Sequence, residues 1–414
     1  MVMLFVYLTT LFIAPQLWIG PLIGFRVDLF VYPLWALLLV LSRDRNPVAL
    51  TAQDRFFLLM VLWIVVSMAT NGFHERSSDL IVNYVKWFIL YKLVSSTVSS
   101  MERLKKVALL LVGFALLLAV EGIQHISGES GLGWAGQSLG WIDAGAGERG
   151  RTQWINIFDG PGVFCVVYTV ALPFLLQYLA APFNWGVRLL GAAALGLLVV
   201  GIYFTGSRGG FLTALGVFGL FMAIRYNVSV VRIVFAAAII LVVFNAAPSY
   251  LTNMQDQSKS AKYRVEMWGE GVEMVQQNPV FGIGKGRFLS YTMKLIAHNS
   301  PIEIMGETGL PGLFFWIGLI YLGMKNVVLY ARETEDGSSR SYAIALGLSV
   351  VGYIISAMFV TLEYETLYFL IGLCASVGFR LKEPPPFTRH DFGILLCVTL
   401  GWVAGVKAFV MVYH

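Results

Sequence analysis

Long apolar runs dominate this sequence and constrain its fold more than any other feature. About thirteen of them approach the ~20 residues that an α-helix needs to cross a hydrocarbon core of ~30 Å. They lie at residues 4–23, 27–41, 55–70, 80–97, 106–123, 160–180, 187–205, 210–226, 230–246, 308–330, 341–361, 365–380 and 392–413. These runs predict an all-α polytopic membrane protein with about 12–13 transmembrane helices, forming a single integral membrane domain over residues 1–414.

Composition excludes the soluble classes of protein. Of the 414 residues, 57% are hydrophobic and 13% are charged, against about 25% charged in an ordinary soluble domain. Lipid must therefore cover much of the surface, and membrane lipids are expected partners. The net charge of +5 does not indicate nucleic acid, because membrane proteins retain Lys and Arg for topology. Cys165, Cys374 and Cys397 lie in apolar stretches and are expected to be packing residues, with no disulfide or metal site.

The basic residues of the short loops predict the orientation. The first run lacks a basic flank and precedes further spans, so it is interpreted as an uncleaved helix. With the N-terminus inside, most Lys and Arg of the short loops fall on the cytoplasmic side, and the short outer loops keep only Arg26 and Arg76. Two long segments then lie outside: an outer loop at 124–159 and a periplasmic segment at 247–307. Any extracytoplasmic chemistry is expected in these two segments.

The outer segments carry cations that the topology rule does not explain. They are Arg149, Arg151, Lys259, Lys262, Arg264, Lys285, Arg287 and Lys294, joined by Arg208 at the outer end of a span. Long translocated loops are exempt from charge bias, so each of these residues has a simpler interpretation as solvated surface. Arg208 is harder to explain in that way. It stands in Gly206-Ser207-Arg208-Gly209-Gly210 between two apolar runs, where an unpaired charge costs ~2.5–3.5 kcal/mol. The turn is expected to bind an anion such as phosphate, unless Arg208 snorkels to the interface.

The second outer segment predicts an amphipathic helix followed by two turns. Val265, Trp268, Val272 and Val275 recur at helical spacing, after Ser258 or Ser260 as a possible cap and before the stop Asn278-Pro279. Arg264 opens the apolar face and either points into the membrane mouth or is solvated. The glycine-rich turn Gly282-Ile283-Gly284-Lys285-Gly286-Arg287 follows with two more cations.

A helix-start signature comes next. In His298-Asn299-Ser300-Pro301-Ile302-Glu303, Ser300 is the predicted N-cap, Pro301 the first helical residue and Glu303 the third residue after the cap. His298 thus stands just ahead of a positive helix end, where an imidazole suits acid–base chemistry beside an anion. A lone loop histidine is more often polar surface. Asn299 is expected either to orient the imidazole or a sugar, or to cap the helix.

Other motifs are rejected on context. Gly145-Ala146-Gly147-Glu148-Arg149-Gly150 spells GxGxxG but has no preceding strand and no βαβ unit. No Walker lysine, metal-ligand spacing or GxSxG elbow is present, so neither a cofactor nor a metal is predicted.

These motifs resemble those of the bacterial O-antigen ligase and polymerase superfamily. Arg208-Gly209-Gly210-Phe211-Leu212 resembles the Arg-x3-Leu element of the ligases, and His298-Asn299 followed by Gly309-Leu310-Pro311-Gly312 resembles their His-Asn-x9-Gly-x2-Gly element. Asn278-Pro279 with Gly282-Ile283-Gly284 is similar to the link between them. The motifs cover roughly residues 205–312. Ligases of this family usually have twelve spans with both ends inside, so thirteen runs depart from the pattern and put the C-terminal assignment in doubt.

The resemblance implies a multi-pass glycosyltransferase of the bacterial inner membrane with a periplasmic active site. It implies transfer of a glycan from undecaprenyl diphosphate to a lipid A-core hydroxyl. The residues suit this chemistry: Arg208, Arg264, Arg287, Lys285 and Arg151 are candidates to bind the diphosphate without a metal, with Arg208 also a catalytic candidate. Neutral His298 is the candidate base, and attack opposite the leaving diphosphate inverts the anomeric carbon.

Three alternatives stay open. A polymerase of the same superfamily is the nearest, since Arg151 and Gly162 resemble an Arg-x10-Gly element of polymerases. Protein-glycosylating ligases differ in their acceptor. A transporter or flippase places ionisable groups near the bilayer midplane, often in repeats. Here the candidate residues gather at one face. Lys86 and Lys92, in the fourth run, are exceptions that either snorkel or line a cavity.

Overall fold

The computed structural model describes residues 1–127, 133–135, 141–142, 151–181, 184–226, 228–229, 232, 254–293 and 295–413. The expected span at 230–246, the GxGxxG pattern at 145–150, and the cations Arg149 and Lys294 lie outside these residues, as does the side chain of Lys259. The outer loop expected at 124–159 is described in part.

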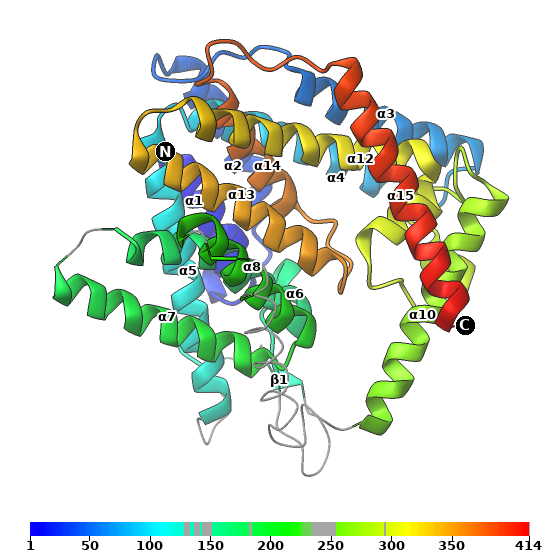
Figure 1. Cartoon of the computed structure of the whole chain (residues 1–414), viewed down its shortest axis with the longest axis horizontal. Helices are drawn as coiled ribbons and strands as arrows, with labels where there is room; N and C mark the ends of the chain where they lie inside the picture. The colour runs from blue at the N-terminus through cyan, green and yellow to red at the C-terminus, as the bar shows by residue number, and fades with distance from the viewer. Residues whose placement is uncertain are drawn as a thin grey trace. The chain divides into compact units, whose positions relative to one another are not determined.

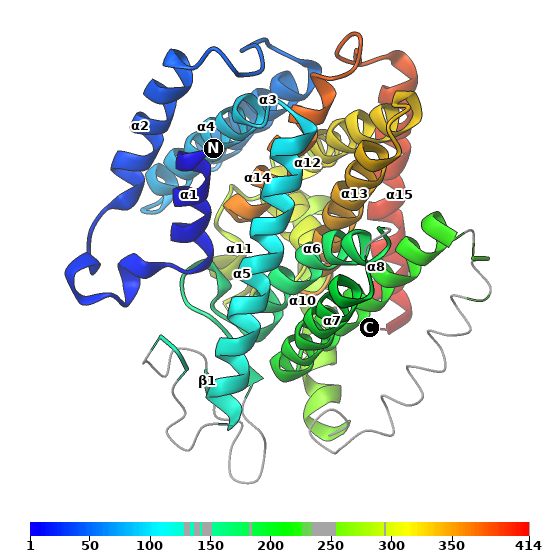
Figure 2. The ribbon, with the colours of Figure 1, turned by 90° about the vertical axis from the view of Figure 1, so that its left-hand side faces the viewer.

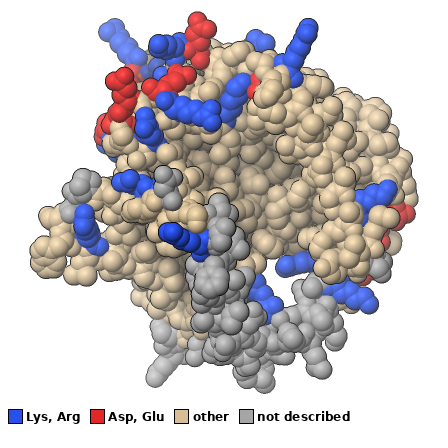
Figure 3. Space-filling view, in the orientation of Figure 1, with Lys and Arg blue, Asp and Glu red and all other residues tan. Residues whose placement is uncertain are grey.

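The prediction of an all-α polytopic membrane protein is confirmed (Figure 1). Eight helices of the described part are long and apolar enough to cross a membrane: α3 (Ala52–Thr70), α5 (Met101–Ser127), α6 (Pro161–Leu179), α7 (Trp185–Thr205), α8 (Arg208–Tyr226), α12 (Ser300–Glu333), α13 (Gly337–Ala357) and α15 (Arg389–Tyr413). Figure 3 shows wide areas with no Lys, Arg, Asp or Glu, as expected of surface in contact with lipid.

Three shorter apolar helices account for further described runs: α1 (Val2–Phe12), α2 (Val27–Leu41) and α14 (Glu365–Gly378). The run at 80–97 forms α4 (Ser77–Thr97), which is long enough to cross a membrane but is not among the eight apolar spans. The prediction for the first run, 4–23, is wrong beyond α1. Ala14 adopts a left-handed φ of 52°, and the 3-10 turns Pro15–Leu17 and Gly20–Leu22 follow. Prolines at 15 and 21 remove backbone donors, which prevents one continuous helix.

The described strands are β1 (Trp141–Ile142) and β2 (Arg151–Thr152), which form one antiparallel pair. Along the sequence, the amphipathic α10 (Met254–Gln277) and the short α11 (Phe288–Thr292) follow α8 and precede α12. The helices group into two compact units, each of which is described by itself. Unit 1 contains residues 1–45, 97–253 and 334–356, and unit 2 contains residues 46–96, 254–333 and 357–414. The single membrane domain expected from the sequence stays a prediction.

Unit 1 is built on α5, α6 and α7, which pack on one another, with α8 against α6 (Figure 2). Small residues allow close approach. A Cβ at Gly201 of α7 would lie 3.0 Å from the Ala119 Cβ of α5, and one at Gly210 of α8 would lie 2.2 Å from the Cys165 Sγ of α6. Cys165 and Cys374 are buried thiols, as the sequence predicts for packing residues, whereas Cys397 is exposed.

Unit 2 is built around α12. The helices α3, α14, α10 and α15 all pack on it. Gly309 interrupts α12 with a φ of 71°, so the element is two helices joined at a kink. This kink organises the segment in which the sequence predicts chemistry.

Candidate functional site

In unit 2 the amphipathic helix α10 covers α12. Of the predicted apolar face, Val272 and Val275 are buried and Val265 is half-buried, and Met267 and Met274 are buried as well. Trp268 is half-buried, and its Nε1 donates a hydrogen bond of 3.0 Å to the Ala297 carbonyl. The helix ends at Gln277, before Asn278-Pro279, as predicted. The predicted start is wrong, because α10 begins at Met254, before Ser258 and Ser260.

The loop after α10 docks on the kink of α12 through backbone hydrogen bonds. The Ile283 and Gly284 amides donate to the Gly306 and Glu307 carbonyls at 3.1 and 2.9 Å. The Leu310 amide donates to the Pro279 carbonyl at 2.9 Å. Glycine is required where the two backbones meet. A Cβ at Gly309 would lie 2.2 Å from the Val280 oxygen, and one at Gly282 would lie 2.4 Å from the Glu307 carbonyl carbon. The Gly-Ile-Gly link and the first motif glycine therefore form one structural joint.

Helix α3 satisfies carbonyl groups that the kink leaves free. Ser67 Oγ donates to the Glu307 oxygen at 2.9 Å and to the Phe281 oxygen at 2.7 Å. Trp63 Nε1 donates to the Thr308 oxygen at 2.8 Å. A buried carbonyl without a partner would cost about 1–3 kcal/mol. The broken helix is thus stabilised from two sides, by the docked loop and by α3.

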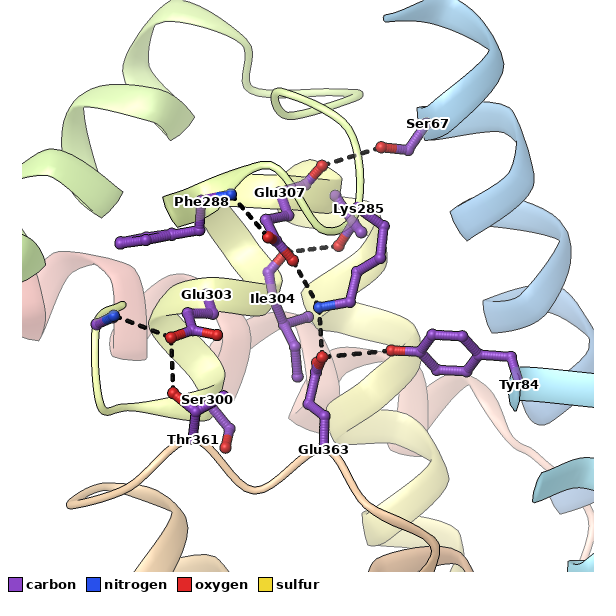
Figure 4. A network of polar contacts seen from close by, with 12 residues as sticks. Ser67, Tyr84, Lys285, Phe288, Ser300, Glu303, Ile304, Glu307, Thr361 and Glu363 are labelled. Atoms are coloured by element: carbon purple, nitrogen blue, oxygen red, sulfur yellow. Dashed lines mark hydrogen bonds and ion pairs between the residues drawn. The ribbon is translucent and has the colours of Figure 1, made fainter. Parts of the chain in front are cut away.

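A buried ion cluster lies beside this joint (Figure 4). Lys285 is 4% exposed and forms ion pairs with Glu307, at 2.6 Å, and with Glu363. The second Glu307 oxygen accepts the Phe288 amide at 2.9 Å, and the Tyr84 hydroxyl donates to Glu363 at 3.4 Å. Burial lowers the pKa of Lys285, but the two carboxylates outweigh this effect and raise it. Lys285 is therefore a charged group with its partners already in place.

The start of α12 differs by one residue from the prediction. Asn299, rather than Ser300, is the cap, because its Oδ1 accepts the Ile302 amide at 3.2 Å. Its Nδ2 donates to the Met358 carbonyl at 3.1 Å. Ser300 is the first helical residue, and its Oγ accepts the Leu362 amide at 2.7 Å. Glu303 reaches back to the Ala297 amide at 2.9 Å and accepts from the Thr361 hydroxyl at 2.6 Å (Figure 4).

His298 stands between these anchored neighbours. Its backbone adopts a left-handed φ of 50°, and its side chain is half-buried. Burial lowers the pKa of His298 below its usual value, and the nearby Arg264 guanidinium lowers it further. Within the described residues, neither side chain has a hydrogen-bond or ion-pair partner. The structure thus brings together a neutral imidazole and a permanently charged guanidinium.

Arg287 and His74 hold the loop from another side. Arg287 is half-buried and donates to the Gly72 carbonyl. The Lys285 carbonyl lies 2.8 Å from His74 Nε2. The Arg76 amide donates to His74 Nδ1 at 3.3 Å, so the proton of the neutral ring lies on Nε2 and is donated to Lys285. This histidine is partnered on both nitrogens, in contrast to His298.

In unit 1, Arg151 and Arg208 both lie at the turn between α7 and α8. The helix α7 ends at Thr205, and Gly206 follows with a left-handed φ of 58°. Arg151 donates through Nε to the Thr205 oxygen and through Nη2 to the Gly206 oxygen, both at 3.1 Å, and so caps this helix end. Ser207 Oγ accepts the Gly210 amide at 3.1 Å and caps α8.

Arg208 opens α8 and is exposed. Among the described residues its guanidinium has no hydrogen-bond or ion-pair partner. The amides of Arg208 and Gly209 have no intrahelical acceptor. The predicted anion-binding turn therefore has the expected local form, with a free guanidinium beside a helix N-terminus.

The sequence missed the carboxylates of the ion cluster. Glu307 and Glu363 make no spacing that marks a site. The available signal was a single charge inside or beside an apolar run, as at Glu307 and Glu363, because such a charge requires a partner. In the described part of the chain, no group of three His, Cys, Asp or Glu side chains has a metal-binding arrangement.

A comparison with protein families gives one match. The O-antigen ligase family, Wzy_C, matches residues 193–317. This range includes Arg208, Arg264, Lys285, Arg287, His298, Asn299 and both motif glycines, Gly309 and Gly312, but not Arg151. No curated protein matches the chain. The match over residues 193–317 supports the O-antigen ligase and polymerase superfamily, a family of multi-pass membrane proteins of the glycosyltransferase type that act on lipid-linked glycans.

Proposed function

We propose that this protein is an O-antigen ligase-type glycosyltransferase. It transfers a glycan from undecaprenyl diphosphate to a lipid A-core hydroxyl on the periplasmic side of the inner membrane. The observation that carries this proposal is the pair of His298 and Arg264, two half-buried groups without partners among the described residues, whereas Lys285 and Arg287 in the neighbouring loop bind partners. The family match supports the substrate class.

His298 is the proposed base. Its lowered pKa keeps the imidazole neutral at physiological pH, so that it can take a proton. The acceptor hydroxyl gives this proton to the imidazole as its oxygen forms a bond to the anomeric carbon. The bond from that carbon to the diphosphate oxygen breaks at the same time on the opposite face, which inverts the configuration. Hydrogen bonds hold the chain on both sides of His298: the Trp268 side chain donates to the Ala297 carbonyl, the Ala297 amide donates to the Glu303 carboxylate, and the Asn299 side chain donates to the Met358 carbonyl.

The negative charge of the leaving diphosphate needs cations rather than a metal in this proposal. Arg264 is assigned to it because its guanidinium is free among the described residues and is always protonated. Arg208 is assigned to an anionic substrate group on the geometry of unit 1 alone, since it opens α8 beside free amides. Arg287 donates to the Gly72 carbonyl and has further N–H groups that can bind a ligand. Lys285, paired with Glu307, and Arg151, bonded to the Thr205 carbonyl, are assigned to stabilising the fold.

Purified protein in lipid vesicles tests the proposal. With undecaprenyl diphosphate-linked glycan and lipid A-core, we expect transfer without a gradient, ATP or added metal. Transfer that requires a gradient or ATP would instead indicate a transporter. A deletion strain separates the two family activities. Loss of a ligase leaves full-length lipid-linked polymer that is missing from lipopolysaccharide, whereas loss of a polymerase leaves single repeats attached.

A further inference from the structure

Unit 1 contains a groove that no part of the proposed reaction uses. It has a volume of about 430 Å³ and lies among α5, α6, α7 and the start of α13. Its walls are apolar and include Leu109 and Val112 of α5, Leu175 of α6, and Leu190 and Ala194 of α7. Leu109 and Leu190 are also highly exposed, at 66% and 73%. The groove is therefore lined for a hydrocarbon chain.

One end of the groove is cationic and aromatic. Glu102, Lys105, Lys106, Tyr178 and Tyr342 line it there. Lys105 pairs with Glu102 at 2.7 Å, and its Nζ lies 5.7 Å from the centre of the Tyr342 ring. Lys106 is exposed, and it has no ion-pair partner among the described residues. Among the residues that line this end, two lysines stand against one glutamate, and Asp336, which is not among the lining residues, also acts on Lys105.

The groove lies at the opposite end of α5 from the Arg151 and Arg208 turn. Gly122 of α5 contacts Thr152, next to Arg151, whereas Lys106 lies sixteen residues earlier on the same helix. Sixteen residues span about 24 Å at the helical rise of 1.5 Å. This length is close to the thickness of a hydrocarbon core of ~30 Å. The lysines and tyrosines therefore stand near one membrane interface, at the level of lipid head groups, and the arginine turn stands near the other.

We infer that this groove binds an anionic glycerophospholipid. One acyl chain lies between α5 and α7, and the phosphate contacts Lys106 and Lys105 near the two tyrosine rings. Apolar walls that end in Lys106, a lysine without an ion-pair partner among the described residues, match a lipid with a negative head group better than a zwitterionic one. A cavity of this size encloses a single acyl chain rather than the long chain of a polyprenyl carrier. The site is independent of the proposed transfer reaction.

Photo-crosslinking tests this inference. The whole protein is reconstituted with a phosphatidylglycerol probe that carries a diazirine in one acyl chain, and the labelled peptides are identified by mass spectrometry. We expect labelling around Leu109–Val112 and Leu190–Ala194, which unlabelled phosphatidylglycerol competes better than phosphatidylcholine. Because each lysine near a membrane surface contributes about 1 kcal/mol toward anionic lipid, K105Q/K106Q should weaken this competition on the order of tenfold.

Matched variants separate a specific site from surrounding lipid. A194F should fill the groove and remove the labelling, whereas A192F, at an exposed position of α7 outside the groove, should not. R188Q removes an exposed charge of α7 outside the groove lining and should retain the competition. Equal competition by phosphatidylcholine, or labelling that A194F and K105Q/K106Q leave unchanged, would refute the inference. Competition by undecaprenyl phosphate but not by phosphatidylglycerol would also refute it and assign the groove to the carrier lipid.

Discussion

Two neighbouring parts of unit 2 treat their charges in opposite ways. Lys285 is buried between Glu307 and Glu363 and forms an ion pair with each of them. The side chains of His298 and Arg264 are half-buried and have no hydrogen-bond or ion-pair partner among the described residues. All three residues lie on segments next to α12: Lys285 on the loop docked at its kink, Arg264 on α10, which packs on it, and His298 just before its first residue. The contrast indicates that the cluster holds the scaffold together, whereas the His298 and Arg264 pair is left free for a substrate.

The largest expected effect comes from H298A. Loss of the proposed base should lower the rate of glycan transfer about 10²–10⁴-fold. Stability should change little, because His298 makes no side-chain hydrogen bond within the described part of the chain. Transfer by purified protein and thermal unfolding in detergent measure the two quantities. H390A removes an exposed histidine of α15 and serves as the control. Transfer by H298A at the wild-type rate would show that His298 is not the base.

K285M should have the opposite profile. It leaves Glu307 and Glu363 buried without their cation, which should lower the free energy of unfolding by about 3–5 kcal/mol. The double variant K285M/E363Q removes one unpaired charge and should recover part of this loss. K262M, at an exposed position of α10, is the control and should unfold like the wild type. If K285M keeps the stability of the wild type but loses transfer, Lys285 binds substrate rather than stabilising the fold.

R264Q should affect both binding and pH dependence. Loss of a charged hydrogen bond to the donor should lower kcat/KM about ten- to a hundredfold. The wild-type rate should rise with pH as His298 loses its proton and level off above its lowered pKa. A cation disfavours protonation of the imidazole, so its removal raises the pKa of His298 and moves the rising limb to higher pH. If R264Q leaves the pH profile unchanged, Arg264 does not lower the pKa of His298.

W268F should have the smallest effect. It removes the hydrogen bond from Trp268 to the Ala297 carbonyl, next to His298. A neutral hydrogen bond contributes about 0.5–1.5 kcal/mol, so we expect a modest loss of stability. A small fall in kcat should accompany it if this anchor positions the imidazole. W185F, at an exposed position of α7, is the control. A fall in stability larger than that of K285M would contradict the division between scaffold and site.

Several elements were predictable from local pattern. The end of α10 before Asn278-Pro279 follows from proline chemistry, and the start of α12 near His298 follows from its capping residues. The choice of Asn299 over Ser300 as the cap was not predictable, because both residues can cap a helix. The Ser300 hydroxyl instead accepts a hydrogen bond from the Leu362 amide, which comes from a segment about sixty residues away. The early break after α1 shows the same limit, since hydropathy continues through Pro15 and Pro21.

The roles of the cations show what the sequence and the tertiary structure each decide. The sequence by itself determined the membrane environment, the helices and the segments that carry excess charge, because hydropathy and capping act over one or two turns of chain. It could not distinguish Lys285 from Arg264, since both are cations in one outer segment. Only the tertiary structure made that distinction. It brings Glu363, 78 residues beyond Lys285, to one cation and supplies no such partner to the other among the described residues. The electrostatic role of a charged side chain depends on which other charged groups lie next to it in the buried interior. Residues distant in the sequence become its neighbours only when the chain folds.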